Sequence, residues 1–159
     1  MALNTLQGLT LSLIQEGHYF VLADSEGAIL ASGGWSRAIP DYKSHYNDPN
    51  PDRPTLESFA TVRCVYVHPD HERRGYAKEI MQRIEEDARE HNVSVLALSS
   101  SRTALALYHS LDYTCGAVHM VKLPNGRGIE LHEMHKALLA CSEFPAVEEQ
   151  RTKNECSSN

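Results

Sequence analysis

Residues 65–77 read Val-Tyr-Val-His-Pro-Asp-His-Glu-Arg-Arg-Gly-Tyr-Ala, a junction at which an apolar strand stops at a proline and a helix begins. The β-branched and aliphatic residues before the proline predict a buried central strand over 59–67. Apolar residues then recur at helical spacing over 75–91, which predicts the most regular helix of the chain. We therefore expect the functional site at this junction.

The start of the helix is suited to holding an anion. Its first backbone N–H groups have no partner within the helix, and the macrodipole is positive at this end. Gly75 and Ala77 let a phosphate approach the backbone, and Arg73 and Arg74 add positive charge. Backbone groups left unpaired at the end of the preceding strand can hydrogen-bond an elongated ligand.

These features resemble the GNAT superfamily of N-acetyltransferases over about residues 17–138. The signature of that family is a hydrophobic strand, a Val-x-Pro step and an Arg/Gln-x-x-Gly-x-Gly/Ala loop that opens a long helix. The resemblance implies that the loop amides hold the pyrophosphate of acetyl-CoA and that the strand pairs with its pantetheine arm. Glu72 occupies the usual Arg/Gln position, which predicts weaker affinity rather than loss of the site. The residues assigned to acetyl-CoA are Val65, Tyr66, Val67, Arg73, Arg74, Gly75, Tyr76, Ala77, Lys78, Ser101 and Ala104.

A second segment, Ser101 to Tyr113, resembles the family pattern Asn-x-x-Ala-x-x-x-Tyr-x-x-x-Gly-Phe/Tyr. Ala104, Tyr108 and Tyr113 match it, whereas Ser101 replaces Asn and Asp112 replaces Gly. In the family this tyrosine points at the CoA sulfur, so the resemblance implies that Tyr108 is the catalytic acid. A phenol, with an ordinary pKa of about 10, can hydrogen-bond and protonate a departing thiolate. The alternative is that Tyr108 is one more apolar-face residue of an amphipathic helix.

The acceptor side is less defined by the sequence. The resemblance places the thioester carbonyl at a backbone N–H within 65–67, which would stabilise the oxyanion. Where family members carry a Glu or His base on the central strand, this chain has Thr61 and Arg63. Arg63 suits either an anionic acceptor, such as a carboxylate or phosphate, or a salt bridge with an acidic residue. His45 is a second substrate-binding candidate. The candidates for the general base, besides a chain of waters, are Glu57, His45 and His119.

The remaining patterns predict a mixed, mostly antiparallel α/β sheet flanked by helices, of the acyl-CoA N-acyltransferase type. Relative to the family, it lacks the usual first strand and part of the first helices. Gly33-Gly34 inside the second strand indicates a bulge or a close backbone approach. The other predicted elements are a short helix at 3–14, hairpin strands at 18–23 and 28–35, a strand at 93–98, a helix at 101–111 and strands at 114–123 and 128–135.

The chain is predicted to hold a single domain, residues 1–140, followed by a polar, disordered tail over 141–159. Residues 37–58 contain four prolines and no periodicity, which suggests a substrate-facing loop. The free sheet edge left by the missing strand favours association into a homodimer.

The bulk composition excludes several classes of function. A net charge of −6 disfavours a generic nucleic-acid or anionic-membrane surface. The sequence shows no apolar run near the roughly 20 residues of a membrane span and no signal peptide, which predicts a cytoplasmic protein. Four scattered cysteines indicate free thiols, and nine histidines without ligand spacing predict no metal site.

The leading functional prediction is an acetyl-CoA-dependent N-acetyltransferase. It would transfer the acetyl group directly, in a ternary complex, to an amine of a small-molecule or peptide acceptor. A covalent route is disfavoured because Cys64, the one cysteine near the site, should point away from Val65. The alternative is a non-catalytic acyl-CoA-binding or protein-interaction module, favoured by Glu72 and by the missing strand base. A P-loop NTPase is excluded, since the chain has no Gly-x-x-x-x-Gly-Lys-Ser/Thr.

Overall fold

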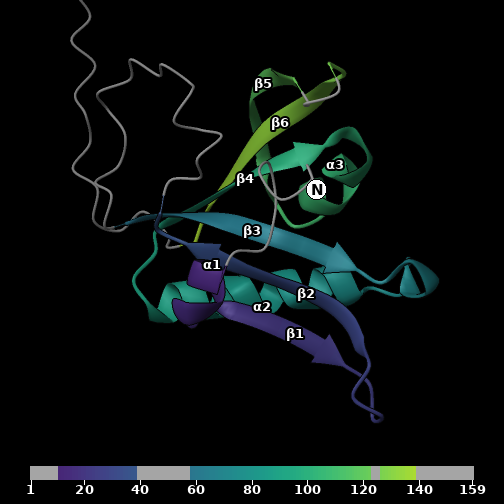
Figure 1. The fold of residues 1–159 in the computed structure, drawn as a ribbon. Coiled ribbons are helices and arrows are strands. Elements are labelled where there is room, and N and C mark those ends of the chain that lie inside the picture. Colours follow the sequence, from purple (N-terminus) through teal and green to yellow (C-terminus); the bar gives the residue numbers. More distant parts are fainter. Residues whose placement is uncertain (1–10, 39–57, 123–125, 139–159) are drawn as a thin grey trace, which may run out of the picture.

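The computed structural model describes residues 11–38, 58–122 and 126–138, and shows one mixed sheet with helices on its faces (Figure 1). Its six strands lie in the order β1-β2-β3-β4-β6-β5. Every neighbouring pair is antiparallel except β3 and β4, which are parallel. The predicted mixed, mostly antiparallel α/β class is thereby confirmed. The elements are α1 (Leu11–Gln15), β1 (Tyr19–Ala23), β2 (Ile29–Ser36), β3 (Phe59–Val67), η2 (Pro69–His71), α2 (Tyr76–Glu90), β4 (Val95–Ser101), η3 (Arg102–Ala104), α3 (Leu105–His109), β5 (Thr114–Lys122) and β6 (Gly128–Ala137).

The central junction forms as the sequence predicts, and the largest departure is at the end of β4. This strand continues to Ser101, three residues beyond its predicted end, because Ser99, Ser100 and Ser101 still pair with β6. The helix predicted over 101–111 is therefore divided into η3 and the short α3. Of the helix predicted over 3–14, only the end is described, as α1. His45, Glu57 and the tail at 141–159 lie outside the described residues.

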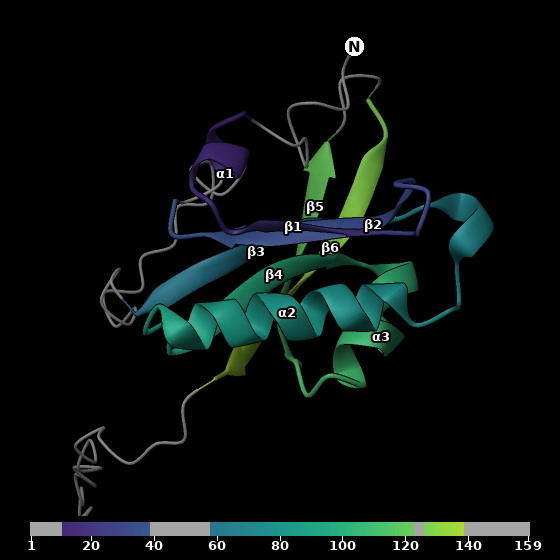
Figure 2. The same cartoon turned by 90° about the horizontal axis from the view of Figure 1, so that it is seen from below.

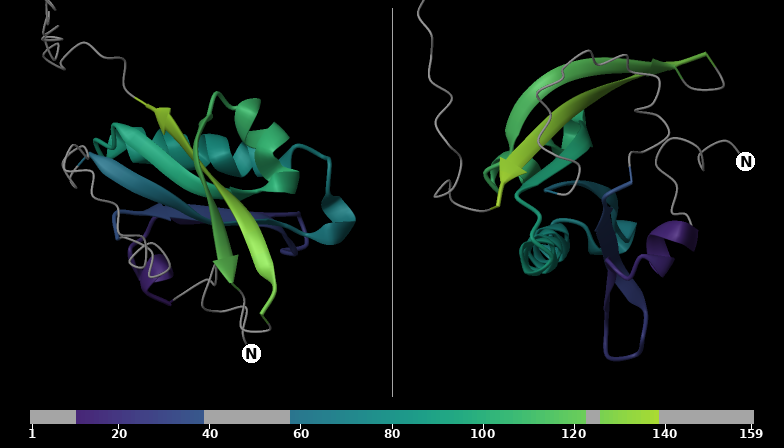
Figure 3. Two further views of the ribbon diagram at one scale, coloured as in Figure 1. Left: turned by 90° about the horizontal axis from the view of Figure 1, so that it is seen from above. Right: turned by 90° about the vertical axis from the view of Figure 1, so that its left-hand side faces the viewer.

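Two helices, α2 and α3, cover one face of the sheet, and α1 lies on the other (Figure 2). The predicted apolar stripe of α2 is buried: Met81, Ile84 and Ala88 are fully enclosed. The carboxylates of Glu85 and Asp87 are buried too, which helical periodicity alone did not predict. At the far end of the sheet, β5 and β6 curve away from β1 and β2 (Figure 3).

A β-bulge interrupts the pairing of β2 with β3. Ser32 lies opposite Tyr66, and Gly34 lies opposite Arg63, so two residues of β3 face Gly33 alone. One of these two, Cys64, has a φ of 56°, in the left-handed region. A Cβ on Gly33 would come within 2.8 Å of Ile80, and one on Gly34 within 2.4 Å of the His18 carbonyl oxygen. The glycine pair therefore serves both predicted purposes, because it permits the bulge and a close backbone approach.

Among the described helices, none has the length and apolar character needed to cross a bilayer.

Candidate active site

The site is a gap between the two parallel strands at the centre of the sheet. β3 and β4 pair at only three positions, Phe59 with Val95, Ala60 with Leu96 and Thr61 with Ala97. Beyond Thr61 they diverge, while β3 stays paired with β2 and β4 with β6. The sheet thus opens along the second half of β3, and a cavity of about 120 Å³ occupies the opening.

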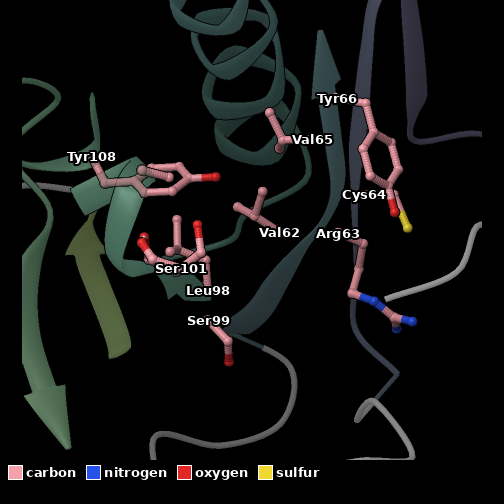
Figure 4. A pocket seen from close by; sticks show the side chains of 11 residues that line it. Val62, Arg63, Cys64, Val65, Tyr66, Leu98, Ser99, Ser101 and Tyr108 are labelled. Carbon is pink, nitrogen blue, oxygen red and sulfur yellow. The ribbon is translucent and has the colours of Figure 1, made fainter. Parts of the chain in front are cut away.

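The cavity has an apolar side and a polar side, because successive side chains along a strand point to opposite faces of the sheet. Val62, Val65 and Tyr108 point toward one another on the side covered by α2 and α3 (Figure 4). Arg63 and Ser99 point away from that side. The gap therefore lies between an apolar wall with one phenol and a polar wall. Among the described residues, its lining is Val62, Arg63, Cys64, Val65, Tyr66, Leu98, Ser99, Ser100, Ser101, Ala104 and Tyr108.

The mouth of α2 lies next to the far end of β3 and is open. The first helical hydrogen bond runs from the Glu79 amide to the Gly75 carbonyl, at 3.0 Å, so the amides of residues 76–78 have no acceptor within the helix. Gly75 has a φ of +88°, and a Cβ placed there would meet no atom within 4 Å. Arg73 and Arg74 are exposed and form no ion pair with a described residue. An anion can therefore reach free amides and two guanidinium groups at this mouth.

Tyr108 enters the gap from α3. Its side chain is buried, with 8% exposed, and its hydroxyl group makes no hydrogen bond to another described residue. Burial raises the pKa of Tyr108 to about 12, so the hydroxyl stays protonated at neutral pH. An ordinary thiol loses its proton near pH 8.5. A phenol of this kind donates a hydrogen bond to a thiolate, whereas full proton transfer to it is uphill. The role of Tyr108 that this geometry favours is thus stabilisation of the leaving sulfur.

Tyr108 packs against Tyr113, which lies next to a buried polar cluster around Glu85 that the sequence did not predict. The Tyr113 ring meets the Tyr108 ring edge to face, with centroids 5.9 Å apart. Burial, followed by the neighbouring Glu85 carboxylate, raises the pKa of Tyr113. Glu85 also accepts hydrogen bonds from Lys136 Nζ at 2.7 Å and from Arg89 Nη2 at 3.1 Å. The Tyr113 ring thus packs against the Tyr108 ring next to this buried carboxylate.

The polar wall continues onto β6. Ser99 is the register partner of Glu133, and opposed residues on paired strands share one face of the sheet. Glu133 Oε1 lies 3.5 Å from His119 Nε2 on β5. Of the three candidate bases from the sequence, His119 contacts Glu133, the residue that pairs with Ser99 of the cavity lining. Glu57 and His45 lie outside the described residues.

The predicted cofactor residues fall into three groups around the gap. Val65, Tyr66 and Val67 lie on the open part of β3, and residues 73–78 form the loop and first turn at the helix mouth, with Lys78 exposed there. Ser101 ends β4 and bonds through its Oγ to Thr103 Oγ1 at 3.0 Å. Ala104, in η3, lines the cavity. Of these residues, Val65, Tyr66, Ser101 and Ala104 line the cavity beside Tyr108, whereas Val67 and residues 73–78 follow Tyr66 along the chain toward the start of α2.

Within the described residues, one group of side chains could meet a metal ion, away from the gap near the end of α2. Ligand atoms of His18, Asp87 and His91 lie within 4.8 Å of one another. The Asp87 carboxylate accepts a hydrogen bond from Trp35 Nε1 at 2.8 Å and lies 2.8 Å from His18 Nδ1. His91 Nδ1 lies 2.7 Å from the Asp87 carbonyl oxygen. These bonds connect the residue before β1 with β2 and α2.

A parallel strand pair that opens beside the mouth of a helix defines the acyl-CoA N-acyltransferase class of fold. The family model for the acetyltransferase (GNAT) domain matches residues 15–115. The chain therefore belongs to the GNAT acetyltransferase family.

Solved structures agree on the fold. The chain is similar to yncA from Salmonella typhimurium, solved with acetyl-CoA, at 20% identity and a TM-score of 0.64, covering 85% of this chain and 73% of that one. Phosphinothricin acetyltransferase from Sinorhizobium meliloti, in complex with AcCoA, gives 14% identity, a TM-score of 0.65 and coverages of 86% and 70%. The ribosomal-protein-S18-alanine N-acetyltransferase from Escherichia coli gives 16% identity and a TM-score of 0.60, covering 88% of this chain and 84% of that one. No curated protein matches the chain in a comparison of sequences.

Proposed function

We propose that the protein transfers the acetyl group of acetyl-CoA to a primary amine, by direct attack within a ternary complex. The observation that carries the proposal is the open half of the β3–β4 pair, whose cavity is lined by Val65 and the buried Tyr108, together with the unbonded amides at the mouth of α2. In this arrangement the amides of residues 76–78, with Arg73 and Arg74, hold the pyrophosphate. The pantetheine arm then follows the open edge of β3, and the thioester reaches Tyr108.

The chemistry is a substitution at the thioester carbon. The amine loses a proton, its nitrogen forms a C–N bond to the carbonyl carbon, and the C–S bond breaks. A backbone N–H of residues 65–67 stabilises the oxyanion, and the Tyr108 hydroxyl donates a hydrogen bond to the leaving sulfur. The thiolate then takes up a proton, so that one amine proton is in effect moved to sulfur.

Direct transfer is favoured over an acetyl-cysteine intermediate. Burial raises the pKa of the Cys64 thiol, which disfavours the nucleophilic thiolate, although the nearby Arg63 charge lowers it in part. Figure 4 shows Cys64 on the other side of β3 from Val65, away from Tyr108.

Two measurements on the wild-type protein test the proposal. Calorimetry with acetyl-CoA tests binding, and thiol release tests transfer, using a panel of free amino acids, a tripeptide with a free amino terminus, and spermidine. We expect saturable binding and amine-dependent release of CoA. Binding with no release for any amine would favour the alternative, a non-catalytic acyl-CoA-binding module, and no binding would overturn the proposal.

A further inference from the structure

We infer that the acceptor is a small amine that also carries a carboxylate, such as a free α-amino acid, held between Arg63 and Glu133 across the gap. The inference rests on the proposed function and assigns the substrate class of the same site. It starts from a row of three side chains on the polar wall, Arg63 on β3, Ser99 on β4 and Glu133 on β6, here called the acceptor row.

Strand register places the three residues on one face. Thr61 and Ala97 form the last β3–β4 pair, and Arg63 and Ser99 each lie two residues further along. Because side chains repeat with a period of two, both lie on the same face as that pair. Ser99 in turn pairs with Glu133. The gap therefore runs between Arg63 on one side and Ser99 with Glu133 on the other.

The acceptor row carries a cation at its β3 end and a carboxylate at its β6 end. Arg63 lines the cavity and has no ion pair with a described residue, so its guanidinium can pair with a carboxylate of the ligand. Glu133 offers an anionic site for an ammonium group, and its side chain is 34% exposed, which leaves it accessible to a ligand. A ligand with both groups would neutralise both sides and place its nitrogen between them, at the gap.

The acceptor row also explains how the amine loses its proton. The acidic partner of the ammonium, Glu133, lies 3.5 Å from His119 on the edge strand β5. An imidazole nitrogen can accept a proton, and the His119 side chain is 25% exposed to solvent. The proton can pass from the ammonium to Glu133 and through His119 to solvent. Tyr108 lies on the opposite wall, so the nitrogen enters and the sulfur leaves on different sides of the thioester.

A peptide amino terminus does not satisfy this arrangement. Its carbonyl is an amide, so it presents no charge to Arg63, and the guanidinium would stay unpaired. An amino acid and its amide therefore distinguish the two classes of acceptor directly, because the amide reproduces the peptide and differs from the acid only in the missing carboxylate.

The test compares kcat/KM for acid and amide pairs, namely methionine, phenylalanine and glutamate with their α-amides, in wild type and in Arg63→Gln. The wild type should prefer at least one acid by about tenfold or more, as expected for a charged Arg–carboxylate pair. In Arg63→Gln we expect that preference to fall to about twofold while the rate with the amide persists. The ratio between the two proteins cancels the different basicity of the two amines.

Glu133→Gln tests the other end of the row. We expect the rate to fall about tenfold or more with acid and amide alike, and Glu133→Asp to restore part of it. The matched control is Glu130→Gln, which removes a carboxylate from the same strand. Glu130 is paired with His132 on the opposite face of β6, at 2.7 Å, so this variant should behave like wild type.

Each outcome decides the matter. If the wild type acetylates the amides or the tripeptide as well as the acids, or if Arg63→Gln keeps the preference, the acceptor assignment is wrong while the proposed transfer stands. If Glu133→Gln and Glu130→Gln behave alike, Glu133 has no part in the acceptor row. If acetyl-CoA binds but no amine is acetylated, the proposed transfer fails together with the acceptor assignment.

Discussion

The two halves of the β3–β4 pair differ in pairing and in burial. In the closed half, three residue pairs join the strands, and Ala60 and Leu96 are fully buried. In the open half, the same two strands diverge and border the cavity. Hydrogen bonding to β2 and β6 holds both strands in place where they no longer hold each other. One strand pair can therefore provide core stability at one end and a ligand path at the other.

The divergence has a physical cause in the twist of the sheet. Neighbouring strands rotate relative to one another, and a bulge increases the local twist. The bulge opposite Gly33 lies just beyond the last β3–β4 pair. We infer that the closed half should respond to mutation through stability, and the open half through binding and catalysis.

The largest effect should come from truncation in the closed half. Leu96→Ala removes a fully buried side chain, and we expect a loss of about 3 kcal/mol in the free energy of unfolding. The acetyl-CoA Kd should change less than about twofold. Leu98→Ala, two residues further on the same face but lining the cavity, should both destabilise the fold and weaken acetyl-CoA binding. Denaturant unfolding measures the stability and calorimetry measures the Kd. If Leu96→Ala and Leu98→Ala changed the acetyl-CoA Kd equally, the two halves would not differ in function.

The helix mouth should respond through binding. Gly75→Glu places a side chain and a negative charge where pyrophosphate is expected, and should weaken acetyl-CoA binding by about 100-fold or more, about 2.7 kcal/mol.

Gly27→Glu is the matched control for this change. Gly27 has a φ of +87° and equally open surroundings, but it lies in the β1–β2 turn. Both substitutions therefore carry the same left-handed strain, and only the first should alter calorimetric affinity. Equal affinities in the two variants would remove the helix mouth from the site.

Tyr108→Phe probes the apolar wall of the open half. Loss of one hydrogen bond to a developing thiolate should lower kcat by about tenfold, about 1.4 kcal/mol, with the acetyl-CoA Kd unchanged. Since burial raises the pKa of Tyr108 to about 12, the hydroxyl keeps its proton at every pH below about 11. The wild-type pH profile should then show no loss of kcat from Tyr108 between pH 8 and 10. Turnover of Tyr108→Phe at the wild-type rate would rule out this role.

The smallest effect should come from Glu72→Gln. Glu72 is exposed at the entrance to the helix mouth, and its charge repels a pyrophosphate. Its neutralisation should tighten acetyl-CoA binding about twofold to threefold at low salt, and the gain should disappear near 0.5 M NaCl, where screening shortens the range of the charge. Weaker binding by Glu72→Gln would show that this residue supports the site instead.

Much of the fold could be predicted because its signals are local. The periodicity of α2, the turn that joins β1 and β2, and the strand–proline–helix junction each arise from residues close together in the chain. The Asp24 carboxylate, for example, accepts hydrogen bonds from the amides of Glu26 and Ala28 within that turn. The extent of α3 was predicted less well, since pairing with β6 extends β4 through Ser101.

The sequence by itself determined the strand, the helix mouth with its free amides, and the tyrosine that matches the family pattern. Only the tertiary structure decided that β3 and β4 part after Thr61, that Glu85 lies buried behind Tyr113, and that Glu133 stands beside the gap with His119. These features depend on which strands become neighbours and in which register. Because that choice is made by pairing between segments 30 to 42 residues apart, no local pattern of residue types records it.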